Sequence, residues 1–152
     1  MCDQWHIPKE KITAVVTDSG ANIVKAVDLS FGKNLHIPCC AHTLNLVAEK
    51  SISSVPNLLD IISKVKSIVT WFKQSVVASD ELRKQTSKKL IQEVQTRWNS
   101  KYYMLERFIE LRAEINDIII RHITAPAMVS ALEIQQIEEI LKLLRTLEAA
   151  TK

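Results

Sequence analysis

Residues that make tight turns are scarce in this chain, which has two glycines and four prolines among 152 residues. A β fold with many hairpins needs more of both, so long helices are favoured. The three cysteines, Cys2, Cys39 and Cys40, are odd in number, and two of them are adjacent. This pattern argues against a disulfide framework and makes a reducing compartment the default.

Long hydrophobic runs are also missing. No apolar run reaches the roughly 18 residues that span a membrane, and the first residues lack the apolar core of a signal peptide. We therefore expect a soluble intracellular protein, nuclear or cytoplasmic. The composition is 47% hydrophobic and 24% charged, as in folded domains, and its length fits one domain or pieces of two. The formal net charge of +3 permits nucleic acid as a partner without requiring it.

The first third of the chain has the pattern of a small α/β unit. Residues 12–17, "ITAVVT", are apolar and β-branched, which is typical of a buried strand. A turn signal at residues 18–20 leads into a helical period that lasts to Gly32, and "NLHIPCC" is a candidate for a second short strand. Two strands do not make a stable sheet by themselves. Residues 1–54 therefore look like a slice of an α/β domain whose other strands are not in this sequence.

From about Ala41 the pattern is helical. Apolar residues recur at steps of three and four over residues 58–72, 98–119 and 134–147, which predicts three amphipathic helices. Ala125 and Pro126 are expected to end the second of them. The predicted fold is mainly α with a small α/β part, divided into residues 1–54 and residues 55–152.

Asp18 follows the first predicted strand directly. In open α/β sheets ligands bind at the carboxyl ends of strands, where an aspartate can reach a metal, and two-metal sites for phosphoryl transfer use several such carboxylates. An aspartate at this place can also turn the chain and cap the next helix. The local sequence leaves both roles open.

"CCAHTLNL" places Cys39, Cys40 and His42 within four residues. A C-x-x-H step can supply two zinc ligands, but a structural zinc site needs four, and the other cysteine and histidines lack the spacing of a zinc module. The sulfurs can equally be small core groups. We therefore do not expect a complete zinc site within this chain.

"QTRWNSKYYMLERF" places Arg97 beside Trp98 at the start of a predicted helix. A guanidinium can bind phosphate and an indole can stack on an exposed base, which suits nucleic acid. Alternatively, Trp98 is the first core residue of an amphipathic helix. The basic residues nearby alternate with glutamates, which is more typical of a solvated face than of a dense basic patch.

The order of the three motifs is informative. T-D-x-x-A-N at residue 17, C-x-x-H-x-L-x-L at residue 39 and T-R-W-N-S at residue 96 together resemble the hAT superfamily of DNA transposases. They resemble equally the domesticated BED-type zinc finger proteins derived from these enzymes. The resemblance extends over nearly the whole chain. It implies a fragment of an RNase H-like domain, residues 1–54, followed by the all-helical insertion domain, residues 55–152.

The resemblance also implies roles for single residues. Asp18 matches the second of three catalytic carboxylates, which bind Mg²⁺ or Mn²⁺ so that water and then a DNA 3′-hydroxyl are activated. Cys39 and His42 match a motif that shapes the active site and its DNA contacts without necessarily binding zinc. Arg97 and Trp98 match a pair linked to a base flipped out beside the cleavage site, where an aromatic face replaces the lost stacking.

Several parts of the family's pattern are expected outside this sequence. The first catalytic aspartate should lie upstream, the catalytic glutamate after the insertion domain, and Glu133, Glu138 and Glu139 are not candidates for it. The BED finger and the dimerisation segment are not in this sequence either. The chain by itself is therefore expected to be inactive, so its status as an enzyme stays open.

The resemblance implies a nuclear protein that binds DNA at transposon ends as a homo-oligomer, with no membrane and no small-molecule substrate. Three functions remain open: part of an active transposase, a domesticated DNA-binding regulator without catalysis, and a helical interaction module.

Overall fold

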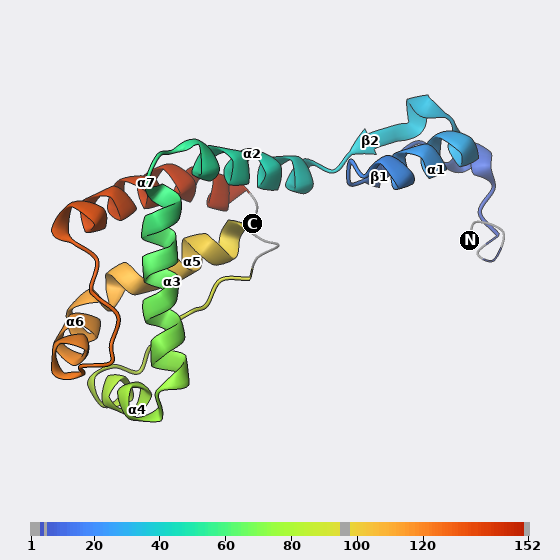
Figure 1. Ribbon diagram of the computed structural model, residues 1–152. Coiled ribbons are helices and arrows are strands. Elements are labelled where there is room, and N and C mark those ends of the chain that lie inside the picture. Colours follow the sequence, from blue (N-terminus) through green and yellow to red (C-terminus); the bar gives the residue numbers. More distant parts are fainter. Residues whose placement is uncertain (1–3, 5, 95–97, 151–152) are drawn as a thin grey trace. The chain divides into compact units, whose positions relative to one another are not determined.

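The computed structural model describes residues 4, 6–94 and 98–150 (Figure 1). Its contacts divide the chain into two compact units, Met1–Val47 and Ala48–Lys152. The division falls within helix α2 (Cys40–Ser54), and the boundary predicted after residue 54 coincides with the end of that helix. Each unit is described here by itself.

The first unit is built on two short parallel strands, β1 (Val15–Thr17) and β2 (His36–Pro38). Helix α1 (Ala21–Phe31) connects them and packs against both. Two short 3₁₀ helices, η2 (Lys9–Lys11) and η3 (Lys33–Leu35), precede β1 and β2. Gly32 lies between α1 and η3 with φ of +93°, a backbone conformation that favours glycine. The predicted strand–helix–strand order is confirmed.

This unit has little core of its own. Among its described residues Val27 alone is buried, whereas Val16 and Ile37 are 61% and 49% exposed. These two residues are register partners on β1 and β2, so they lie on the same face of the sheet. Parallel sheets are normally covered on both faces, and a face of this kind normally packs against further elements.

The second unit is helical. Its described residues form the end of α2 and five further helices: α3 (Leu58–Gln74), α4 (Val76–Gln85), α5 (Trp98–Glu110), α6 (Arg112–Arg121) and α7 (Ala131–Ala150). Helix α3 packs against α4 and α5, α5 packs against α6 and α7, and α4 packs against α6. The fold is thus mainly helical with a small two-stranded parallel sheet, as predicted.

Helix α3 is the central element of this unit's core. Its buried side chains follow one another at steps of one and three residues, which places them on one apolar face: Leu58, Ile61, Ile62, Val65, Ile68, Val69 and Phe72. The same core includes side chains of α5 and α6, among them Met104, Phe108, Ile115 and Ile118, each 0% exposed. One continuous apolar core therefore holds the helices together.

The single helix predicted over residues 98–119 is wrong in one respect, since the structure has two helices there. The chain leaves helical geometry at Leu111, where φ is −101° and ψ is 15°, and α6 begins at the next residue. Leu111 is 2% exposed, and Ile115 donates its backbone N–H to the carbonyl of Leu111 at 2.9 Å. Each helix buries its own apolar face in the same core. The hydrophobic period therefore continues across the break and conceals it.

In the part of the chain that the structure describes, no helix combines the length and the apolar character needed to cross a membrane.

Candidate functional site

The carboxyl ends of β1 and β2 lie side by side. Thr17 and Pro38 are register partners, so Asp18 and Cys39 follow two paired positions. The backbone N–H of Cys39 donates to the carbonyl of Thr17 at 2.7 Å, which extends the pairing by one residue. The fold therefore brings two predicted site residues to one edge of the sheet, the edge at which α/β sheets bind ligands.

Asp18 forms the turn between β1 and α1. Its side chain is exposed, and Oδ1 accepts a hydrogen bond from the backbone N–H of Gly20 at 3.1 Å. A Cβ atom added to Gly20 would lie 3.1 Å from the same oxygen, which is tighter than ordinary packing. The turn role is thus visible in the structure, and the carboxylate remains accessible to solvent.

His36 is a neighbour of this edge that the sequence pattern did not identify. Its Nε2 lies 2.8 Å from Oγ1 of Thr17, and that hydroxyl donates to the carbonyl of Asp18 at 2.9 Å. Thr17 and His36 thus share a side-chain hydrogen bond between the two strands, in which the His36 tautomer sets the donor. His36 also lines a hollow of about 520 Å³ together with Ser19 and Lys25. Only the strand register reveals this proximity.

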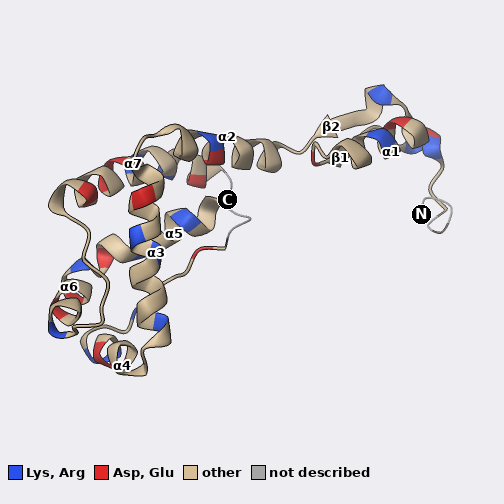
Figure 2. Ribbon diagram, in the orientation of Figure 1, with Lys and Arg blue, Asp and Glu red and all other residues tan. Residues whose placement is uncertain are grey.

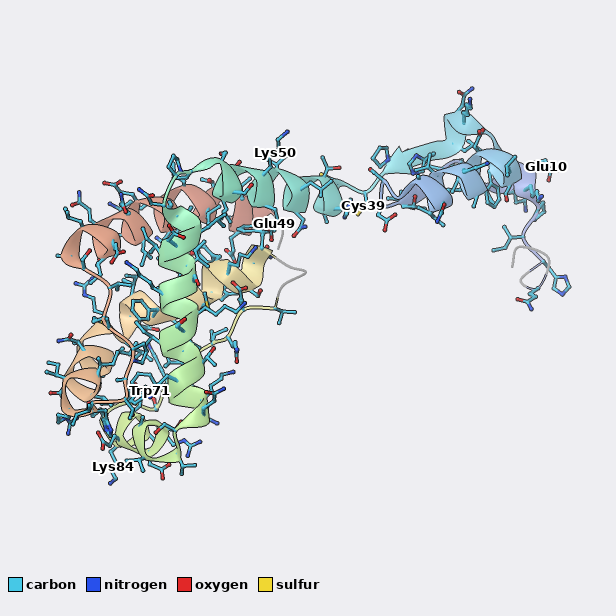
Figure 3. All side chains as sticks on the ribbon, in the orientation of Figure 1. Glu10, Cys39, Glu49, Lys50, Trp71 and Lys84 are labelled. Carbon is cyan, nitrogen blue, oxygen red and sulfur yellow. The ribbon has the colours of Figure 1, made fainter. Side chains whose placement is uncertain are left out.

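Cys39 and His42 lie at the start of α2. The carbonyl of Cys39 accepts two hydrogen bonds from Thr43, one from its backbone N–H at 3.0 Å and one from Oγ1 at 3.1 Å. Figure 3 labels Cys39 at this helix start. Cys39, which directly precedes the helix, and His42, on its first turn, are both partly exposed. Side chains with this spacing share one side of a helix.

The fit of a divalent metal at this edge is partial. Mg²⁺ requires near-octahedral oxygen coordination, usually from one or two carboxylates together with water and phosphate oxygens. Asp18 offers one exposed carboxylate. Across residues 4, 6–94 and 98–150, no three His, Cys, Asp or Glu side chains gather closely enough to hold a metal ion. The residues present therefore do not form a metal site by themselves.

The predicted nucleic-acid pair belongs to the second unit. Arg97 lies outside the described residues. Trp98 begins α5 and is 2% exposed, and its ring meets that of Tyr102 edge-on with 6.4 Å between centroids. Both faces of a buried indole are covered by protein, so stacking on a base would require the ring or its neighbours to move. The base-stacking role of Trp98 stays a prediction.

Polar groups between α5 and α7 have protein partners. The hydroxyl of Tyr103 donates to the buried carboxylate of Glu148 at 2.5 Å, and that of Tyr102 donates to Glu106 at 2.9 Å. Burial raises the pKa of Tyr102 above its ordinary value of 10.0, and the nearby guanidinium of Arg145 opposes this effect. These hydrogen bonds give the two tyrosine hydroxyls partners within the protein, as buried polar groups require.

Comparison with known proteins identifies the family. The model of the family described as the ZBED1 RNase-like helical domain matches residues 37–143. The chain is 28% identical over 148 residues, 93% of its length, to the human zinc finger BED domain-containing protein 4. It is 30% identical over 121 residues, 67% of its length, to two Zea mays proteins described as AC and AC9 transposases.

The match covers a small part of each relative. This chain spans 12% of the length of the human protein and 15% and 14% of the two Zea mays proteins. The family match begins within β2 and extends through α6 into α7, so it contains Cys39, His42 and Trp98, whereas Asp18 precedes it. The chain therefore belongs to the family of the ZBED1 RNase-like helical domain, among the hAT transposases and their BED zinc finger relatives.

Proposed function

We propose that this chain is part of a hAT transposase-like protein whose full-length form binds DNA and cuts and joins it with the help of divalent metal. In this proposal the first unit is a portion of an RNase H-like core and the second unit is the helical insertion domain. The observation that carries it is the place of Asp18, exposed at the carboxyl edge of two paired parallel strands. The proposed place of action is the nucleus, on transposon ends, as a homo-oligomer.

Each predicted residue has a defined part in this function. Asp18 would supply one carboxylate to a Mg²⁺ or Mn²⁺ site that further carboxylates complete, and the metal would supply a polarised water or hydroxyl as nucleophile. Cys39 and His42, beside Asp18 or one turn further on, would shape the edge that faces DNA. Arg97 and Trp98 would contact DNA from the insertion domain.

The substitution Asp18→Asn separates the two roles of this side chain. An asparagine oxygen can still accept the N–H of Gly20, so the turn is kept, while the negative charge that a metal needs is removed. We expect metal-dependent cleavage of DNA carrying the terminal repeats that flank the gene to fall about a hundredfold or more, since even groups behind metal ligands cost tenfold to a hundredfold. Cleavage is measured on the full-length protein in Mg²⁺ and in Mn²⁺.

A matched control is Glu10→Gln, which neutralises an exposed carboxylate on η2 of the same unit, before the start of β1. It should cleave as the unmodified protein does. Full cleavage by Asp18→Asn, with the protein folded, would show that Asp18 only forms the turn and is not a metal ligand.

The second candidate is a DNA-binding protein without catalysis. It is favoured by the likeness to the human zinc finger BED domain-containing protein, which covers more of this chain than the likeness to the Zea mays transposases does. The same assay distinguishes the two. In a non-catalytic protein the unmodified form binds DNA but does not cleave it in either metal, and Asp18→Asn changes neither property.

A further inference from the structure

Positive charge is concentrated in one segment of the second unit. Residues 73–90 contain five lysines and arginines against two carboxylates, a net charge of +3. The whole chain also has a formal net charge of +3, so the remaining residues sum to zero. Figure 2 shows basic positions at the end of α3 that leads into α4 and on α4 itself.

Four of these cations converge on a hollow of about 270 Å³, which we call the basic hollow: Lys73, Arg83, Lys88 and Lys89. Apolar side chains form part of its lining, among them Phe72 and Leu82. Among the residues that the structure describes, no carboxylate belongs to the lining, although glutamates alternate with the basic residues along the sequence. The fold thus brings Lys73 beside residues that are ten to sixteen positions further along the chain.

The backbone around the basic hollow is held in place by specific contacts. The hydroxyl of Ser79 donates to the carbonyl of Phe72 at 2.5 Å, which joins the start of α4 to the end of α3. The guanidinium of Arg107 donates to the carbonyl of Lys89 at 2.8 Å, and the neighbouring Leu90 is buried. The cations are therefore presented from fixed backbone positions, which lowers the entropy lost on binding.

Nearby carboxylates neutralise only part of this charge. Arg83 pairs with Asp80 at 2.8 Å, and Lys88 pairs with Glu110. Lys73 and Lys89 form no ion pair with a described residue, and both are exposed. Lys84, at the outer edge of α4 in Figure 3, is exposed and does not line the basic hollow. Two lysines in the basic hollow are thus available to an external anion.

Helix ends explain some of these cations but not all of them. Lys73 lies in the last turn of α3, and Arg83 and Lys84 lie in the last turn of α4, where a positive charge favours the helix dipole. Lys88 and Lys89 follow the end of α4, outside any helix. Their convergence with Lys73 is not required by the stability of the helices.

We propose that the basic hollow binds a backbone phosphate of nucleic acid and so anchors DNA on the second unit. Lysine and arginine contacts to phosphates position a protein on a duplex without reading its sequence. The inference rests on the proposed function, since it assumes that the full-length protein binds DNA. It adds a contact surface that none of the three sequence motifs contains.

The test uses the full-length protein and a fluorescein-labelled duplex of random sequence, with binding followed by fluorescence anisotropy over a range of KCl concentrations. The variant is Lys73→Gln/Lys89→Gln. Loss of this phosphate contact should weaken binding roughly tenfold at about 0.1 M salt and lower the slope of log K against log salt by about 1. The matched control Lys50→Gln/Lys142→Gln removes two exposed lysines outside the basic hollow and should lower the slope less.

The outcomes distinguish this inference from the proposed function. If the unmodified protein binds DNA and the variant keeps its affinity and salt slope, the basic hollow does not bind DNA and the proposed function stands. If the unmodified protein does not bind DNA, both fail. A variant that loses binding to phosphatidylserine vesicles but not to DNA would assign the basic hollow to a lipid surface and overturn the inference. Thermal unfolding checks that the variant is folded.

Discussion

The indole of Trp98 is 2% exposed and meets the ring of Tyr102 in a T-shaped arrangement with 6.4 Å between centroids. A tryptophan that starts an amphipathic helix contributes mainly by removing apolar surface from water. The same ring is the one that the family resemblance links to DNA. Burial and base stacking make opposite demands on it, since stacking needs an open face.

Substitution of Trp98 measures how much the buried ring contributes to stability. We expect Trp98→Ala to lower the free energy of unfolding by about 3–5 kcal/mol, as for other buried aromatics, and Trp98→Phe to lower it less because part of the apolar volume is kept. Urea unfolding of both variants, followed by far-UV circular dichroism, measures this. Unchanged stability in Trp98→Ala would show that the ring is not a core group and would favour the stacking role.

At the scale of residues, the sequence pattern identified those that follow a recognisable local signal. Asp18 was found because it ends an apolar, β-branched run, and Cys39 and His42 because their spacing is compact. His36 and Lys73 gave no such signal, because each is a candidate only through a residue far along the chain, Thr17 across the strand pair and Lys89 across the basic hollow. Nothing in the flanking residues of either one encodes that distant partner.

At the scale of elements, the start of α7 shows how a short sequence sets a helix boundary. Ser130 and Glu133 form a reciprocal capping box, in which the N–H of Ser130 donates to Oε2 of Glu133 at 2.8 Å and the N–H of Glu133 donates to Oγ of Ser130 at 3.3 Å. The ammonium of Lys64 on α3 bonds to the other oxygen of Glu133 at 2.5 Å. The cap therefore also joins α7 to α3.

This cap predicts a pH dependence. The Lys64 ammonium, followed by the N–H of Ser130, lowers the pKa of Glu133 below its ordinary value of 4.5. A carboxylate whose pKa is lower in the folded state stabilises that state fully above about pH 4.5, and this stabilisation is lost as the pH falls through the lowered pKa. Glu133→Gln should therefore have a lower Tm than the unmodified protein at neutral pH, and the two should converge in acid.

Thermal unfolding at a series of pH values measures this convergence. Glu139→Gln is the matched control, because it removes an exposed carboxylate from the same helix outside the capping box and should change Tm little at any pH. A constant difference between Glu133→Gln and the unmodified protein, down to the most acidic pH, would mean that the charge of Glu133 is not the stabilising feature.

The break at Leu111 shows what periodicity does not contain. A hydrophobic period reports which face of a helix is buried, and α5 and α6 bury residues such as Phe108 and Ile115 in one core. The turn between them uses no glycine and no proline, so it lacks the usual signal of a helix end. Similarly, the sequence predicted two strands at the correct places, but their parallel register follows from the path of α1 and not from either strand alone.

At the scale of the whole molecule, the two units differ in how much apolar surface they bury. The second unit has a continuous core, whereas among the described residues of the first unit only Val27 is buried. Stability is expected to follow this difference, because local opening is easiest where few apolar contacts are made. The second unit is therefore the part of this chain best able to fold independently.

The boundary of that unit can be tested with two fragments, residues 48–152 and residues 55–152. The second half of α2 contributes Ala48 and Ile52, 0% and 3% exposed, to the core of the second unit, and Glu49 pairs with Lys101 of α5 at 2.6 Å. We expect both fragments to be helical by circular dichroism and fragment 55–152 to be less stable to urea by about 2–5 kcal/mol, the usual cost of losing one large aliphatic core side chain.

Two substitutions in fragment 48–152 show whether the lost contacts are the reason. Ile52→Ala should reproduce much of the difference between the fragments, because it removes the largest buried side chain of this helix segment. Leu132→Ala, at a residue that is 74% exposed on α7, should have little effect. Equal stability of the two fragments would place the boundary after residue 54, where the sequence pattern put it. A clear loss would place it inside α2, so that one helix belongs to both units.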